Sequence, residues 1–239
     1  MTPTSAQLYD AVDETWPAAR RWTEGRWTLR EGQGGGKRVS AATALGEIAA
    51  PDIAKAEAGM VAIGQKPLFM VREGEENLDA LLAAEGYAVV DPVILYSLPI
   101  ENLTDVPIPR VTAFTIWEPL AIMREIWAEG GIGPARLGVM ARAKVKTAIF
   151  ARWNEKPAGV AFAAVQGEIC MVHAVEVPTH QRRQGVAQWI MRKTAFWGHA
   201  QGAKHISVLC VEENKAANAL YRALGFAPVA RYHYRHKPE

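Results

Sequence analysis

Residues 169–200 constrain the fold of this chain most, because they place a basic, glycine-containing loop between a strand and a helix. Residues 169–177 (ICMVHAVEV) are rich in β-branched side chains and predict a strand. The loop that follows contains Arg182 and Gly185 in the pattern Arg-x-x-Gly-x-Ala. Apolar residues then recur three or four positions apart, which predicts a helix over 186–200. A strand, a basic loop and a helix in this order favour an α/β fold.

The loop and the first turn of that helix predict an anion site. Gly185 has no Cβ, so a ligand can approach the backbone closely. The first turn offers unpaired N–H groups and the positive end of the helix dipole, and Arg182 and Arg183 add charge. This combination suits a phosphate or pyrophosphate. It is not a P-loop or a dinucleotide fingerprint. An arginine-rich turn that is merely solvated is the alternative.

A second motif follows the loop. The predicted strand 205–211 leads into NKAANALYRALGF (214–226), a predicted helix that carries Tyr221 and ends at Gly225. With both motifs in this order, the chain resembles the GNAT superfamily of acyl-CoA-dependent N-acyltransferases. In that family an Arg/Gln-x-x-Gly-x-Gly/Ala loop precedes an Asn-x-x-Ala-x-x-Leu-Tyr-x-x-x-Gly-Phe helix. The resemblance spans about residues 146–235, with Ala187 where glycine is commoner.

The resemblance implies acetyl-CoA as co-substrate, bound without a metal. The loop would hold the pyrophosphate, and the backbone of 175–177 would pair with the pantetheine arm. An N–H of that backbone would face the thioester carbonyl. Asn214 also suits a plain helix N-cap. The implied cofactor-binding residues are Val175, Val177, Arg182, Arg183, Gln184, Gly185, Val186, Ala187, Gln188, Asn214, Ala217 and Tyr221.

Acetyl transfer to an amine needs an acid for the leaving thiolate and a base for the amine. Tyr221 suits the acid, since a phenol with a pKa near 10 stays protonated at neutral pH; its alternative role is packing. His173 and Glu176 are the candidate bases, with water alone a third option. His173 matches one of two histidines of the arylalkylamine acetyltransferases, but the other position holds Met171. The glutamate position of the ribosomal-protein N-terminal acetyltransferases holds Leu209.

Composition indicates an ordinary globular protein, with 49% hydrophobic and 22% charged residues. A net charge of +2 gives no general argument for nucleic-acid binding. We expect no secretory signal, since residues 1–16 are polar and acidic, and no apolar run reaches membrane-spanning length. Cys170 and Cys210 lie in predicted strands without metal spacing, which indicates reduced thiols in a cytoplasmic protein. Burial there would raise a thiol's pKa, so neither favours a covalent acyl-enzyme.

Three prolines within residues 99–109 predict an extended connector between two domains, 1–105 and 106–239. Residues 78–87 (LDALLAAEGY) align with 217–226, so the first domain resembles a degenerate copy of the second. Leu82 stands at the position of Tyr221 there, and no Arg-x-x-Gly loop precedes it. Chance similarity of two short Ala/Leu helices is the alternative. The predicted fold is α/β, with a GNAT-like mixed, mostly antiparallel sheet flanked by helices in two related domains.

Further elements are expected from periodicity and turn residues. Strands are predicted at 27–30, 37–42, 67–72, 88–97, 146–153, 158–165 and 227–235, and helices at 52–63, 77–84, 117–129, 134–143 and 215–224.

The sequence therefore predicts an acyltransferase. It would move an acetyl group from acetyl-CoA to a primary amine by direct attack in a ternary complex. The alternative is a catalytically inactive acyl-CoA sensor or scaffold. Residues 117–136 and the N-terminal half would build the acceptor pocket, and the protein would be a monomer or homodimer, with neither nucleic acid nor membrane as a partner. A fragment that begins near Val111 is expected to keep CoA binding and lose acceptor turnover.

Overall fold

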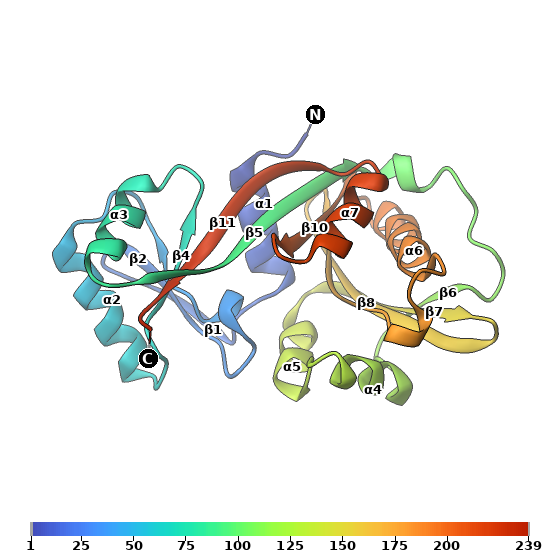
Figure 1. The fold of residues 1–239 in the computed structure, drawn as a ribbon, viewed down its shortest axis with the longest axis horizontal. Coiled ribbons are helices and arrows are strands. Elements are labelled where there is room, and N and C mark those ends of the chain that lie inside the picture. Colours follow the sequence, from blue (N-terminus) through green and yellow to red (C-terminus); the bar gives the residue numbers. More distant parts are fainter. Residues whose placement is uncertain (1, 239) are drawn as a thin grey trace. The chain divides into compact units, whose positions relative to one another are not determined.

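Two long strands, β5 (Ala88–Pro99) and β11 (Ala227–His236), organise the fold, because each begins in one compact unit and ends in the other. The structure is a computed structural model that describes residues 2–238 (Figure 1). Unit 1 comprises the chain up to Pro17, Leu95–Cys210 and Lys215–Val229. Unit 2 comprises Ala18–Ile94, Val211–Asn214 and the chain from Ala230 on.

The sheet of unit 1 runs in the order β5-β10-β9-β8-β7-β6. Its remaining strands are β6 (Ala113–Ile116), β7 (Val145–Trp153), β8 (Lys156–Gln166), β9 (Ile169–Glu176) and β10 (His205–Val211). The strands β6 to β9 pair antiparallel, whereas β9 and β10 pair parallel. This mixed, mostly antiparallel sheet confirms the predicted fold class.

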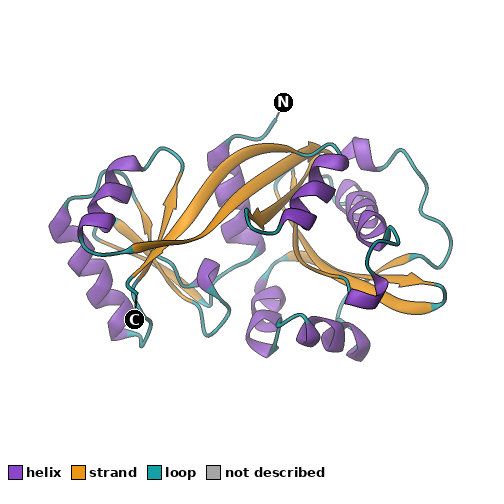
Figure 2. Cartoon of the chain, viewed as in Figure 1, coloured by secondary structure: helices purple, strands orange, loops and turns teal. Residues whose placement is uncertain are grey.

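Helices cover both faces of this sheet (Figure 2). Helix α6 (Val186–Ala200) packs on β7, β8 and β9. Gly159 of β8 lets α6 approach, since a Cβ there would lie 3.0 Å from the Ile190 side chain. Helices α1 (Ser5–Thr15) and α4 (Ala121–Glu129) contact β8 and β9 from the other face, where His173 meets Thr15. Unit 1 also contains α5 (Pro134–Arg142) and α7 (Lys215–Ala223).

Unit 2 has its own core and a three-stranded sheet of β1 (Arg20–Glu24), β2 (Trp27–Glu31) and β3 (Thr43–Ala44). It also holds β4 (Leu68–Arg72), α2 (Ala50–Ala62) and α3 (Glu76–Ala84). Large apolar side chains fill the core, among them Trp27, Leu29, Ile53, Met60, Phe69, Leu78 and Leu82. Leu82 therefore packs where the corresponding helix of unit 1 carries Tyr221.

The final strands of the two halves are exchanged. In the chain, β5 follows α3 and β11 follows α7. Yet β4 of unit 2 pairs antiparallel with β11, with Phe69 opposite Arg235. The neighbour of β10 in unit 1 is β5, where Ser207 Oγ donates to Ser97 Oγ over 3.0 Å. Each half thus completes its sheet with a strand that follows the other half's last helix.

Most predicted elements form within a few residues of their expected bounds, but three expectations were wrong. The segment 99–109 is not a plain extended connector: a 3-10 helix over Ile100–Leu103 buries Ile100 and Leu103, and Asp105 pairs with Arg192 of α6. The predicted strand 37–42 is largely a 3-10 helix over Lys37–Val39. The predicted helix 117–129 begins only at Ala121, and β6 precedes it.

The compact units group residues by contact, so they do not coincide with the ranges 1–105 and 106–239. That division was predicted for two related copies, and it stays a prediction. No helix within residues 2–238 combines the length and the apolar character that crossing a membrane requires.

Candidate active site

The ladder between β9 and β10 ends before either strand does. Its parallel pairs run from Ile169–His205 to Val172–Val208, whereas β9 continues to Glu176 and β10 to Val211. Beyond His173, the β9 residues 174–176 have no strand partner on this side among the described residues. An extended ligand can therefore pair with the last residues of β9, as an added strand would.

On its other side, β9 carries a bulge. Two of its residues, Ala174 and Val175, oppose the single residue Ala161 of β8. Ala174 has a φ of 51°, in the left-handed region. The indole Nε1–H of Trp127, on α4, donates to the carbonyl oxygen of Ala174 over 2.8 Å. The bulge thus turns the peptide between Ala174 and Val175 out of the regular ladder.

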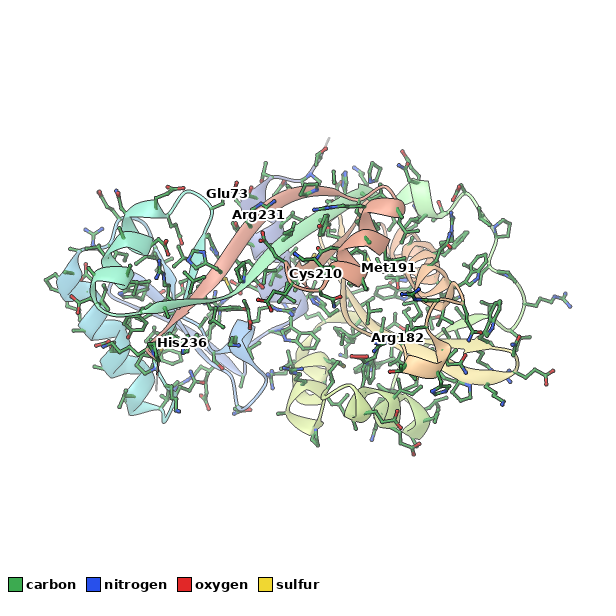
Figure 3. The ribbon with its side chains drawn as sticks, in the orientation of Figure 1. Glu73, Arg182, Met191, Cys210, Arg231 and His236 are labelled. Carbon is green, nitrogen blue, oxygen red and sulfur yellow. The ribbon has the colours of Figure 1, made fainter. Side chains whose placement is uncertain are left out.

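The basic loop ends at a helix start that no described side chain caps. Gly185 is the N-cap of α6, with a φ of 78°, and a Cβ there would meet no described atom within 4 Å. Arg182 and Arg183 are exposed, and Arg182 Nε donates to the carbonyl of Val177 over 2.9 Å (Figure 3 labels Arg182). No described side chain therefore takes up the first-turn N–H groups of 186–188, where an anion site stays a prediction.

Most of the predicted cofactor residues lie on one continuous run, 175–188, at the end of β9. Within it Gln184 and Ala187 are half-buried, Val186 is buried and Gln188 is exposed. The other three lie farther along the chain: Ala217 and Tyr221 on α7, and Asn214 directly before that helix, at the position of an N-cap. By contacts, Asn214 groups with unit 2.

Glu176, the last residue of β9, places its carboxyl group against the end of α4. A Cβ built on Gly130, the C-cap of α4, would lie 2.4 Å from the Glu176 carboxyl carbon and 2.5 Å from its Oε1. Only glycine leaves room for the carboxylate there. Burial raises the pKa of Glu176 above its usual 4.5, and the nearby Arg182 partly offsets this. Such a carboxylate is suited to accept a proton.

His173 is held between β9 and α1. Its ring is 3% exposed and packs against Trp16, with ring centroids 5.1 Å apart. Its Nε2 lies 2.9 Å from Thr15 Oγ1, and the Thr15 hydroxyl donates to the carbonyl of Ala11 over 2.5 Å. Since that hydroxyl proton is used, this geometry assigns a proton to His173 Nε2. The Nε2 atom is therefore a donor to α1.

Tyr221 is 5% exposed, and its ring packs against Tyr96 and Phe226 with centroids about 6 Å apart. Burial raises the pKa of its hydroxyl well above 10, so the hydroxyl keeps its proton at neutral pH. Cys170 and Cys210 are buried free thiols. Burial raises the pKa of Cys210 to about 11 and that of Cys170 further, so neither supplies a thiolate.

Two residues of this site were not singled out from the sequence. Trp127 lies within the predicted helix 117–129, but local patterning gives no partner for its indole N–H. Gly130 directly follows the predicted helix 117–129, a position at which glycine is common. Both contacts are long-range, 47 residues apart for Trp127 and Ala174, and local patterning does not encode them.

Residues 120–226 match the family described as acetyltransferase (GNAT) family. Over 63 residues the chain is 32% identical to the uncharacterized N-acetyltransferase YobR of Bacillus subtilis (strain 168), and the match covers only 26% of each chain.

Two solved structures share the fold over nearly the whole chain. A GCN5-related N-acetyltransferase from Kribbella flavida has a TM-score of 0.73 at 18% identity, covering 100% of this chain and 97% of that one. A tandem GNAT protein from the clavulanic acid biosynthesis pathway has a TM-score of 0.63 at 14% identity, covering 98% and 89%. At such identities the likeness is one of fold.

Proposed function

We propose that the protein is an N-acetyltransferase that moves an acetyl group from acetyl-CoA to the primary amine of an acceptor, in keeping with the match of residues 120–226 to the acetyltransferase (GNAT) family. One observation carries the proposal. The uncapped start of α6, with its two exposed arginines, directly follows the stretch of β9 that lacks a strand partner. An anion site next to a free strand edge fits a ligand that has both a diphosphate and an extended amide arm.

In this proposal the N–H groups of 186–188 and the guanidinium groups of Arg182 and Arg183 bind the diphosphate. The backbone of 175–177 pairs with the pantetheine amides. The N–H of Val175 points at the thioester carbonyl and stabilises the negative charge that develops on its oxygen. One acetyl-CoA binds per chain. In unit 2, Leu82 occupies the position that aligns with Tyr221, and no basic glycine loop precedes its helix.

The acceptor amine attacks the thioester directly, forming the N–C bond as the C–S bond breaks. Glu176 takes the amine proton, directly or through water, and the hydroxyl of Tyr221 protonates the leaving sulfur. We prefer Glu176 to His173 as the base because the Nε2 of His173 donates to Thr15, whereas Glu176 has a raised pKa and lies at the strand end. The buried thiols leave no route through an acyl-cysteine.

The second candidate, an inactive acyl-CoA sensor, is supported by the burial of Tyr221, which resembles that of a packing residue. Turnover separates the two functions. The sensor binds acetyl-CoA and releases no CoA thiol with any amine, whereas the enzyme releases CoA in a screen of amines.

The cofactor site is tested by calorimetry with acetyl-CoA on Gly185→Val. The added side chain would stand where the anion approaches, so affinity should fall at least about tenfold. Gly202→Val is the matched control: Gly202 follows the other end of α6, has a φ of 89°, and a Cβ there also meets no described atom within 4 Å. Both variants carry the same left-handed strain. Equal affinity in the two variants, or two CoA molecules per chain, would contradict the assignment.

A further inference from the structure

We propose that Trp127 is a positioning residue, which orients the N–H of Val175 toward the acetyl thioester. The inference rests on the function proposed above. Trp127 lies on α4, its side chain is 0% exposed, and its indole N–H donates to the carbonyl of Ala174 over 2.8 Å. The indole thus contacts the backbone of β9 at the bulge, next to the stretch assigned to the thioester.

The planarity of the peptide group links this hydrogen bond to the N–H of Val175. The carbonyl of Ala174 and the N–H of Val175 belong to one trans peptide, so they point in opposite directions. Fixing the carbonyl toward α4 therefore fixes the N–H away from α4. A regular ladder would impose this orientation through its own hydrogen bonds. At a bulge the ladder is interrupted, so another group must impose it.

The backbone at this point needs such a restraint. Ala174 adopts a φ of 51°, which a residue with a Cβ seldom occupies unless its surroundings enforce it. Helix α4 supplies two contacts here: the indole of Trp127 on the Ala174 carbonyl, and the close approach of Gly130 to the Glu176 carboxyl group. The same helix thus positions both the Val175 N–H that would donate to the thioester carbonyl and the Glu176 carboxylate proposed as the base.

A merely structural role for the Trp127 hydrogen bond would satisfy a buried carbonyl and do nothing more. The chain offers a matched control for that role. Trp27 of unit 2 is also 0% exposed, and its Nε1 donates to the backbone carbonyl of Asp52 over 2.8 Å. Trp127→Phe and Trp27→Phe each remove one indole N–H from a backbone carbonyl and keep an aromatic ring.

The experiment measures both variants and the wild-type protein in three ways: melting temperature, steady-state kinetics with acetyl-CoA, and the infrared carbonyl stretch of bound ¹³C-labelled acetyl-CoA. Trp127→Phe should lower kcat about 10- to 100-fold, with the KM for acetyl-CoA changed less than about threefold. The bound carbonyl stretch should move back toward that of free acetyl-CoA. The pH profile should keep its shape, because no acid or base is altered. Trp27→Phe should lower the melting temperature similarly and leave kcat and the stretch unchanged.

Equal kcat losses in the two variants, or a carbonyl stretch that Trp127→Phe leaves at its wild-type value, would overturn the role of Trp127. A wild-type protein that binds no acetyl-CoA would instead overturn the proposed function, and the inference with it. If Trp127→Phe does not fold, Ala174→Gly decides. Glycine accepts the left-handed φ without strain but loosens the peptide, so kcat should fall several-fold while stability holds. An unchanged kcat in Ala174→Gly would then count against the inference.

Discussion

At the scale of single residues, the carboxyl group of Glu176 lies where a side chain on residue 130 would otherwise be. Gly130 has a φ of −81°, which any residue can adopt, so backbone conformation does not require glycine at this position. The requirement comes from Glu176, whose carboxyl atoms would lie within 2.5 Å of an added Cβ. A single methyl group at residue 130 would therefore displace the proposed base without disturbing the backbone.

We expect Glu176→Gln to lower kcat by about 10²- to 10³-fold, within the range for general bases. The wild-type rate should fall on the acid side as Glu176 becomes protonated, at a pH above the usual carboxyl value of 4.5, because burial raises its pKa. The variant should lack that acid limb in a kcat profile against pH. A raised folded-state pKa makes the charged form unfavourable for stability as pH rises through it, so the variant should be no less stable at pH 7.

Gly130→Ala tests the same carboxylate while Glu176 stays in place. Only the flexible end of that side chain must move, so the melting temperature should change little while kcat falls. A normal kcat in both Glu176→Gln and Gly130→Ala would leave water as the base.

At the scale of elements, a carboxylate on α3 joins that helix to the last strand of the chain. Asp79 accepts two hydrogen bonds from Arg235 of β11, at 2.8 and 2.9 Å, and its Oδ1 lies 2.6 Å from His233 Nε2. Arg235 also donates to the carbonyl of Tyr87 over 2.7 Å. All four residues belong to unit 2. Because Arg235 is mostly buried, this pair is held more firmly than a surface ion pair.

Asp79→Asn should destabilise the protein by about 1–3 kcal/mol at neutral pH, the usual range for hydrogen bonds to charged groups. Hydrogen bonds from Arg235 keep the pKa of Asp79 below 3.8. Its contribution is therefore fully present above pH 3.8 and is lost as pH falls through the lowered value. Urea melts at pH 7 and in acid should show the difference between wild type and variant shrinking. Asp91→Asn, which breaks the exposed Lys37–Asp91 pair, should cost less than about 1 kcal/mol. Equal losses in the two variants would count against a special role for Asp79.

At the scale of the whole molecule, strand exchange means that neither half of the chain contains a complete unit. Unit 1 takes α1 and the end of β5 from the N-terminal part, and unit 2 takes the end of β11 from the C-terminal part. The contacts are specific: Thr15 and Trp16 pack on His173, and Ser97 accepts from Ser207. The sequence-based expectation for a fragment beginning near Val111 overlooked this dependence.

We now expect the fragment 111–238 to be unfolded or aggregated and to bind no CoA. It exposes the faces of β8 and β9 that α1 covers and the edge of β10 that β5 covers. Circular dichroism melts and calorimetry against the full chain provide the check. A cooperative melt together with full-chain CoA affinity would show that α1 and β5 are dispensable.

Local patterns predicted the elements around the proposed cofactor site well, because strand 169–176, the loop and α6 are contiguous in the chain. Helix α1 was missed, although its Thr4–Gln7 capping box is a local signal. Local patterns could not predict which strands lie side by side in the sheet. Periodicity predicts a strand over 88–97, but nothing in the pattern says that this strand lies beside β10 rather than β4. The contact between Trp127 and Ala174 has the same character, since it depends on how α4 packs.

The exchange of final strands also sets an order of events during translation. On the ribosome, β4 is synthesised early, and its neighbour β11 emerges only after residues 120–226 have been made. Until then the nascent chain presents an unpaired strand edge in unit 2. Unit 2 is therefore the last part of the protein to be completed, although most of its residues are made first.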